Sequence, residues 1–157
     1  MKNNVTRLLD QKKIKYTVYE LPPEKLGAEV TAKMLGVPPE IVFKTIVVKR
    51  EDRGKPILAV VPGDREVDLK KLAAVVGEKK VFLATQNEAE KLTRLQTGGI
   101  SPLALINRGF QVVIDQSAQE HFEIHISGGQ RGVNIRLPAN DLVKLTNAFL
   151  AEIDRSG

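Results

Sequence analysis

Hydrophobic residues along this chain recur at two spacings, one typical of α-helices and the other of β-strands. The helical spacing occurs in several short segments, most of which begin at a capping residue or end at a glycine. Helices are therefore expected after Asn3 or Asn4, over residues 28–35, from Asp68 to Gly77, after the Thr85–Glu88 capping box, and from Pro138 through Leu142 and Leu145 to Phe149.

Strands are predicted where apolar residues alternate with polar ones or follow one another without interruption. The expected strands cover residues 16–20, 41–48, 57–61, 80–84, 112–115, 122–126 and 133–137. Helices and strands do not follow a strict βαβ order, and the last two strands form a hairpin. The fold class is therefore expected to be α+β, with a mixed, largely antiparallel twisted sheet or partial barrel surrounded by helices.

Length and composition are those of an ordinary globular protein with an aliphatic core. The chain has 157 residues, of which 42% are hydrophobic but only 4% are aromatic, and residues 1–157 are expected to form one domain. Cysteine is absent, which excludes disulfides, thiolate metal sites and a cysteine nucleophile. Without a signal-peptide pattern or a run of about 18 apolar residues, the expectation is a soluble, cytoplasmic protein.

The formal net charge of +5 at pH 7 favours polyanionic partners through long-range attraction. Basic pairs such as Lys12–Lys13, Lys49–Arg50 and Lys79–Lys80 are scattered along the chain, and no arginine-rich tail is present. Composition alone therefore leaves nucleic-acid binding and a mildly basic, solvated surface equally open.

Lys44 interrupts an apolar run from Ile41 to Val48 that otherwise has the pattern of a buried strand. Burial of an ammonium group is costly unless an anion or several hydrogen-bond acceptors meet it. A lysine in this place can grip a phosphate, polarise a carbonyl or act as a base. The alternative is a side chain near the strand end that extends its ammonium into solvent.

Two glycine-rich loops follow Lys44 along the chain, Gly98-Gly99-Ile100-Ser101-Pro102 and Ser127-Gly128-Gly129-Gln130-Arg131-Gly132. Glycines permit positive φ angles and close approach of a ligand to the backbone. Arg131 could pair with a phosphate through two parallel hydrogen bonds. Each loop taken alone could equally be an ordinary turn or a long hairpin connection. Together with Lys44, the loops suggest a site for a polar, anionic ligand.

The remaining polar residues offer no convincing catalytic arrangement or metal site. His121 and His125 would lie roughly 13 Å apart along one strand, too far to share a metal ion. Ser101 and Ser127 lack a visible His–acid partnership that would make either of them a nucleophile. Asp115 ends a strand, where a carboxylate commonly caps a turn. No metal ligand and no cofactor are therefore expected.

Val42-Phe43-Lys44-Thr45 and the two glycine loops, taken together, resemble motifs of the YbaK/EbsC family in the same order and at similar spacing. Members of this family are freestanding relatives of the editing domain inserted in bacterial prolyl-tRNA synthetases. The resemblance spans nearly the whole chain and implies a twisted, mixed sheet closing towards a barrel, with outer helices. It also implies a trans-acting deacylase, and the loop at 98–103 looks more like the branch that removes cysteine from tRNA(Pro) than the branches that remove alanine.

The resemblance also implies roles for individual residues. Lys44 matches the family's essential lysine, which would contact the terminal adenosine or its phosphate and help hold the aminoacyl ester. Gly98 and Gly99 would join Lys44 in catalysis by supplying backbone donors. The expected substrate-binding residues are Tyr19, Ile100, Ser101, Pro102, Ser127, Gly128, Gly129 and Arg131. Asn134 departs from the family pattern, because the YbaK branch often has an aspartate there.

The reaction implied by the resemblance needs no nucleophile from the protein. An aminoacyl ester is already activated, so the protein has only to orient it and stabilise the developing oxyanion. In the cysteine branch the substrate thiol attacks the ester carbonyl, and attack by water is the alternative. The expected partners are aminoacyl-tRNA(Pro), aminoacyl-tRNA(Cys) and prolyl-tRNA synthetase, but neither a membrane nor DNA. The competing hypotheses are a non-catalytic module that binds tRNA ends or a synthetase, and a deacylase for Ala-tRNA(Pro).

Overall fold

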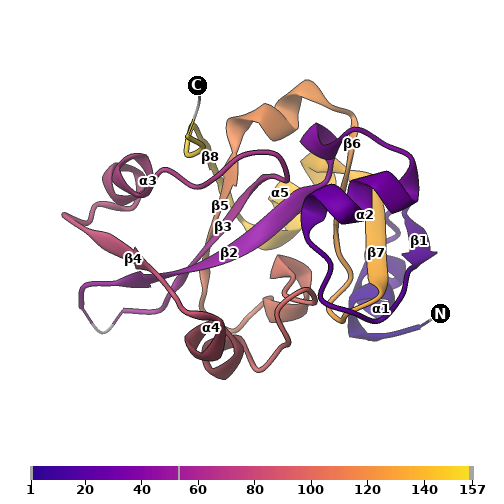
Figure 1. The fold of residues 1–157 in the computed structure, drawn as a ribbon, viewed down its shortest axis with the longest axis horizontal. Coiled ribbons are helices and arrows are strands. Elements are labelled where there is room, and N and C mark those ends of the chain that lie inside the picture. Colours follow the sequence, from indigo (N-terminus) through magenta and orange to yellow (C-terminus); the bar gives the residue numbers. More distant parts are fainter. Residues whose placement is uncertain (1, 53, 156–157) are drawn as a thin grey trace.

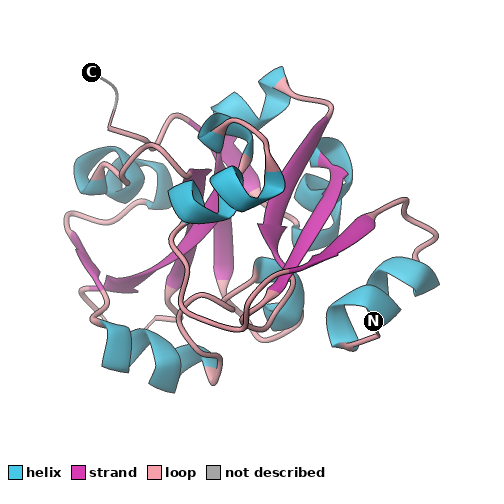
Figure 2. Cartoon of the chain, turned by 45° about the vertical axis from the view of Figure 1, so that its right-hand side comes forward, coloured by secondary structure: helices cyan, strands magenta, loops and turns pink. Residues whose placement is uncertain are grey.

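Two β-sheets with helices around them make up the computed structural model, which describes residues 2–52 and 54–155 (Figures 1 and 2). The predicted α+β fold with outer helices is confirmed, and the strands of the described residues form two separate sheets without closing into a barrel. The helices are α1 (Asn4–Gln11), α2 (Ala28–Leu35), α3 (Leu69–Val76), α4 (Gln86–Thr93) and α5 (Ala139–Thr146), with 3-10 turns η1 (Pro39–Ile41), η2 (Pro102–Leu105) and η3 (Gln116–Glu120). None of the described helices is long and apolar enough to cross a membrane.

The larger sheet has the strand order β4-β2-β3-β5-β8 and runs through the middle of the molecule (Figure 1). Its strands are β2 (Phe43–Arg50), β3 (Ile57–Pro62), β4 (Val81–Leu83), β5 (Gln111–Asp115) and β8 (Phe149–Ala151). β2 pairs antiparallel with β3 and β4, whereas β5 pairs parallel with β3 and β8. Every residue of β3 is buried, because this central strand has a hydrophobic cluster on each face.

The smaller sheet is antiparallel, with the order β1-β7-β6, and its strands are β1 (Thr17–Glu20), β6 (Glu123–Ser127) and β7 (Val133–Pro138). Since side chains alternate along a strand, this sheet has one apolar face and one polar face. The apolar face contributes Ile124, Ile126, Ile135 and Leu137 to the core, and each is fully buried. The polar face carries Tyr19, His125, Ser127, Asn134 and Arg136. Val42, directly before β2, forms a bridge with His125 that joins the two sheets.

Local capping chemistry sets most helix boundaries where the sequence predicts them. Asn3 caps α1 and Thr85 caps α4, each through a capping box, and the carboxylate of Asp68 caps α3. Gly36 and Gly77 end α2 and α3 in the left-handed conformation, with φ of 71° and 76°.

Two predictions about the C-terminal half of the chain are wrong. α5 ends at Thr146, and Phe149 begins the edge strand β8 instead of extending the helix. Asn147 adopts a left-handed φ of 53° directly after α5, which stops the helix before Phe149 is reached. Phe122, expected to be the first residue of the strand over residues 122–126, lies before β6 and is 81% exposed.

Candidate functional site

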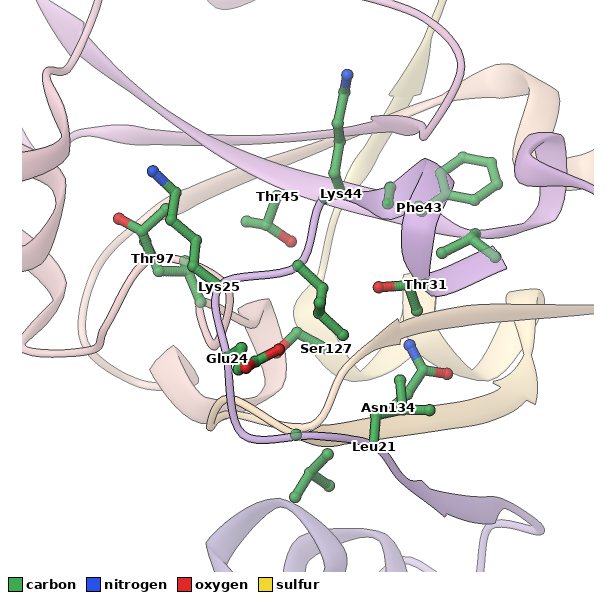
Figure 3. A pocket seen from close by; sticks show the side chains of 18 of the residues that line it. Leu21, Glu24, Lys25, Thr31, Phe43, Lys44, Thr45, Thr97, Ser127 and Asn134 are labelled. Atoms are coloured by element: carbon green, nitrogen blue, oxygen red, sulfur yellow. The ribbon is translucent and has the colours of Figure 1, made fainter. Parts of the chain in front are cut away.

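A pocket of about 280 Å³ lies where the two sheets meet, between the start of β2, the segment leading into α2 and the two glycine loops (Figure 3). Its polar lining residues are Glu24, Lys25, Thr31, Lys44, Thr45, Thr97, Ser127 and Asn134. Apolar surface comes from Leu21, Val42, Phe43, Ile46, Ile100 and Val133. The pocket therefore combines an apolar wall with hydroxyl, amide and charged groups of both signs, as expected for a site that orients a polar ligand.

Lys44 lines this pocket from β2, so the sequence motif and the geometry agree on its position. Its side chain is 23% exposed, and its Nζ lies 3.3 Å from Oε1 of Glu66, a side chain that is 75% exposed. In Figure 3 the Lys44 side chain extends away from Ser127 and Asn134, which lie on the other side of the pocket. An exposed carboxylate is a weak partner for an ammonium group, so an anion that enters the pocket can compete with Glu66 for Lys44.

The first glycine loop contributes two residues to the pocket, Gly98 and Ile100. Ser101 is fully buried, and its hydroxyl accepts a hydrogen bond of 3.2 Å from the backbone N–H of Leu103 at the start of η2. Pro102 is also buried, at the first position of this turn. Ser101 and Pro102 thus shape the loop from behind and do not line the pocket.

The two glycine loops are held together at a junction next to the pocket. A Cβ atom on Gly99 would lie 2.7 Å from Cα of Gln130, so only glycine permits this approach of the two backbones. Nε of Arg131 donates to the carbonyl of Thr97 at 2.7 Å, and its Nη2 lies 4.0 Å from Oε2 of Glu90. The same Glu90 carboxylate accepts from the N–H of Thr97, which lowers the pKa of Glu90 below its usual value. Arg131, expected to face a phosphate, lies at this junction and does not line the pocket.

The second glycine loop reaches the pocket through its two ends, Ser127 and Gly132. The hydroxyl of Ser127 accepts a hydrogen bond of 3.3 Å from the N–H of Gly129, whose φ of 96° favours glycine. A Cβ atom on Gly128 would lie 2.4 Å from Cγ1 of Val133. Gly128 and Gly129 therefore build the turn between β6 and β7 and do not line the pocket.

Asn134 lines the pocket and is held by a histidine behind it. Nδ1 of His125 lies 2.8 Å from Oδ1 of Asn134, and the two residues are 1% and 5% exposed. Burial lowers the pKa of His125 below its usual value, and the hydrogen bond between its Nδ1 and Oδ1 of Asn134 offsets only part of this effect. Tyr19 does not line the pocket, because its ring packs against that of His125 with 5.5 Å between centroids.

The stability of the fold is expected to fall as the pH drops below about 6.5, because the unfolded chain takes up a proton that the buried imidazole of His125 does not. Tyr19, Asn134, Arg136 and Glu123 surround this ring. Because the pKa of His125 is lower in the folded chain than in the unfolded chain, His125 lowers the stability only at pH values below the pKa of the unfolded chain. His125→Leu should therefore remove this dependence of the unfolding free energy on pH, whose slope is at most about 1.4 kcal/mol per pH unit. Denaturant unfolding at several pH values measures it, and equal slopes in both proteins would contradict the prediction.

Sequence reasoning missed the pocket residues that lie outside the motifs. Glu24 and Lys25 come from the irregular segment after Pro22-Pro23, and Thr31 comes from the first turns of α2. In the sequence, these two residues are a charged pair in a segment with no hydrophobic periodicity, directly after two prolines that end a strand. This pattern predicts a loop, but it does not predict that the loop lies next to β2.

No metal centre is formed by the described residues, in which no group of three or more His, Asp or Glu side chains is placed to hold an ion. His121 and His125, considered from the sequence as a pair, belong to different environments. His121 follows η3 and is half-buried, whereas His125 is buried in β6.

Comparison with known proteins decides the family. The family model described as "Aminoacyl-tRNA editing domain" matches residues 22–145, which include Lys44, both glycine loops and Asn134. The chain belongs to this family. The resemblance to the YbaK/EbsC proteins is thereby confirmed.

Individual relatives of this editing domain agree with the match. The chain is 37% identical over 154 residues to the candidate Cys-tRNA(Pro)/Cys-tRNA(Cys) deacylase EbsC of Enterococcus faecalis, covering 97% of this chain and 93% of that protein. It is 38% identical over 85 residues to a proline–tRNA ligase of Desulforamulus reducens, covering 54% of this chain but 15% of the ligase. A crystal structure described as a candidate trans-editing enzyme for prolyl-tRNA synthetase superposes with a TM-score of 0.81 and 25% identity, covering 99% of both chains.

Proposed function

We propose that this protein is a trans-editing deacylase that removes cysteine from Cys-tRNA(Pro). The observation that carries the proposal is the assembly of Lys44, Gly98 and Ser127 around one pocket in a chain of the editing family. These residues are far apart in the sequence, and their convergence is what a site for the aminoacyl end of a tRNA requires. The similarity to EbsC over nearly the whole chain favours cysteine as the amino acid removed.

The pocket offers the groups that ester cleavage needs without a protein nucleophile. Among the described residues, the backbone N–H groups of Gly98 and Ile100 donate to no other group, so they are available for a developing oxyanion. The N–H of Gly99 is instead used by the carbonyl of Gln96 at 2.8 Å. Lys44 supplies positive charge for the terminal adenosine or its phosphate. Oxyanion stabilisation is therefore proposed for the backbone at Gly98 and Ile100, and anchoring of the nucleotide for Lys44.

The thiol of a cysteinyl ester can supply the nucleophile in such a pocket. Its sulfur attacks the ester carbonyl carbon, the bond from that carbon to the ribose oxygen breaks, and the thiol proton ends on the released ribose hydroxyl. The pocket has to hold the cysteine side chain folded back, with its sulfur next to the ester carbonyl, and to exclude side-chain conformations that point the sulfur away. Attack by water gives free cysteine instead and needs the same oxyanion donors.

The test is a deacylation panel with Cys-tRNA(Pro), Ala-tRNA(Pro), Pro-tRNA(Pro) and Cys-tRNA(Cys). We expect Cys-tRNA(Pro) to be cleaved fastest and Pro-tRNA(Pro) to be spared, as measured by loss of labelled amino acid from the tRNA. An S-methyl-cysteinyl substrate separates the two routes, because it blocks attack by sulfur but not attack by water. Faster cleavage of Ala-tRNA(Pro) than of Cys-tRNA(Pro) would show that alanine, and not cysteine, is the amino acid removed. Binding of tRNA without cleavage of any ester would favour a non-catalytic module.

The proposal extends to partners and place of action. A net charge of +5 favours the polyanionic acceptor stem, and the segment shared with a proline–tRNA ligase favours cooperation with that synthetase. We also propose that the protein acts in the cytoplasm, where editing follows tRNA charging, and that residues 1–157 act as one editing domain.

A further inference from the structure

Asn134 occupies a position where three strands bring polar side chains to the same face. It lies directly opposite Ser127 on β6 and Tyr19 on β1, and residues opposite each other on paired strands share a face of the sheet. Ser127 and Asn134 line the pocket, whereas Tyr19 lies farther along this face. Figure 3 shows the amide nitrogen of Asn134 on the side of Thr31 and its oxygen turned away from the pocket centre. The amide nitrogen of Asn134 therefore faces the pocket, and its oxygen faces the protein interior.

The side-chain oxygen of Asn134 is held by His125, whose second ring nitrogen makes no hydrogen bond to the described residues. Nδ1 contacts Oδ1 of Asn134 at 2.8 Å, but the buried Nε2 has no hydrogen-bond partner among the described residues. A neutral imidazole carries one proton, on one of its two nitrogens. Buried N–H groups without a partner are rarer than unpaired acceptors, so the proton belongs on Nδ1. His125 then donates to Oδ1 of Asn134.

This tautomer sets what Asn134 can offer a ligand. Its oxygen is occupied by His125, so the carboxamide presents N–H donors and no free acceptor to the pocket. An aspartate at this position would present the opposite polarity, because a carboxylate only accepts hydrogen bonds. The pair of His125 and Asn134 thus gives this pocket a fixed hydrogen-bond donor.

The surroundings of the pair keep its geometry rigid. The ring of Tyr19 packs against His125, and the guanidinium of Arg136 lies 5.8 Å from the centre of the Tyr19 ring. Arg136 is in turn 3.5 Å from the carboxylate of Glu123. A hydrogen bond enclosed in this way is stronger than the same bond in water.

We propose that Asn134 is a substrate-contacting residue that donates a hydrogen bond to the ester carbonyl oxygen of the bound aminoacyl group, and that His125 is the positioning residue that holds it. The inference rests on the proposed deacylase function and deepens it. Of the polar groups on an aminoacyl ester, the carbonyl oxygen is a pure acceptor, whereas the α-ammonium is a pure donor and would be repelled by this amide. The bond strengthens as negative charge develops on that oxygen, so it acts on kcat more than on KM.

Four variants test the inference in the deacylation assay. Asn134→Asp replaces the donor with an acceptor of the same shape, and Asn134→Ala removes it. We expect each to lower kcat by at least about tenfold with little change in KM. His125→Leu removes the group that holds Asn134 and should lower kcat similarly. His125→Asn, whose amide N–H can reach the same oxygen, should restore most of the activity.

An unmodified protein provides a measurement that does not depend on the reaction. Correlation of the imidazole ¹⁵N and ¹H signals of His125 by NMR identifies which nitrogen carries the proton. A neutral ring protonated on Nδ1 at pH 7 is expected, and protonation on Nε2 would overturn the inference whatever the enzyme cleaves. Wild-type turnover that survives both Asn134→Asp and His125→Leu would overturn the inference and leave the deacylase proposal standing. Absence of wild-type turnover on every ester would refute both.

Discussion

Replacement of Lys44 with alanine is expected to lower kcat/KM for deacylation at least about 100-fold, which corresponds to about 2.7 kcal/mol of transition-state stabilisation. Lys44 is the one motif residue that brings a full positive charge to the wall of the pocket from the larger sheet. Removal of that charge leaves Lys25 as the remaining cation among the described residues that line the pocket, so the nucleotide is anchored less firmly and the ester is held less well for attack. Single-turnover deacylation of Cys-tRNA(Pro) measures the loss.

Lys49 provides a matched control on the same strand. It is also a β2 lysine paired with a glutamate, Glu88, and it does not line the pocket. Both ion pairs are exposed enough to contribute less than about 1 kcal/mol to stability, so the two alanine variants should unfold within about 1 kcal/mol of the wild type. Lys49→Ala should keep its activity. Full activity in Lys44→Ala would refute the role assigned to this residue, and equal losses in both variants would point to a general effect of surface charge.

A Lys44→Met variant separates the charge from the side-chain stem. Methionine retains most of the aliphatic length that packs along the pocket wall but carries no ammonium group. Activity as low as that of Lys44→Ala would assign the effect to the charge. Recovery to near wild-type activity would instead show that Lys44 acts through packing.

Helix boundaries and most strands could be predicted because their signals are local. The capping residues Asn3, Asp68 and Thr85 act within one turn of the helix they begin, and Gly77 ends α3 through its own left-handed conformation. Such interactions depend on sequence spacing of three or four residues and are therefore visible in the sequence itself. β8 carries no comparable signal, since its three residues form a strand only by pairing with β5.

The pocket could be predicted only in part, for the same physical reason. Lys44 and Ser127 were identified from the residue types that a ligand site needs, and both line the pocket. Arg131 has the right chemistry for a phosphate, but its guanidinium is used by the carbonyl of Thr97 on a distant loop. A side chain's partner across sheets and loops depends on strand register, which periodicity alone does not determine.

His125 shows this dependence most clearly. From the sequence it was considered only as a metal ligand, together with His121. Its contact with Asn134 runs diagonally between β6 and β7, and it exists because His125 pairs with Arg136 and Ser127 pairs with Asn134. A shift of the register by one residue would turn Asn134 to the apolar face of the sheet and remove it from the pocket.

Gly99→Ala is expected to lower deacylation by about 10- to 100-fold and to destabilise the fold by about 1–3 kcal/mol. The added Cβ would meet backbone atoms of Gln130 and Arg131 at 2.7–2.8 Å, and backbone cannot move aside as a flexible side chain can. The two glycine loops must therefore separate. Gly98 and Ser127 line the pocket from these two loops, so their separation displaces the oxyanion donors relative to the rest of the pocket.

Thermal unfolding, together with single-turnover deacylation measured well below the melting temperature, distinguishes misplacement of the loops from loss of folding. Gly27→Ala is a control for stability only, because Gly27 itself lines the pocket, but a Cβ there meets no atom within 4 Å and its φ is −73°. Arg131→Ala releases the same junction from the other loop by removing the bond to Thr97, and should lower activity without adding a clash. Wild-type stability and activity in Gly99→Ala would mean that the loops tolerate separation, and the contact at Gly99 would then have no part in shaping the pocket.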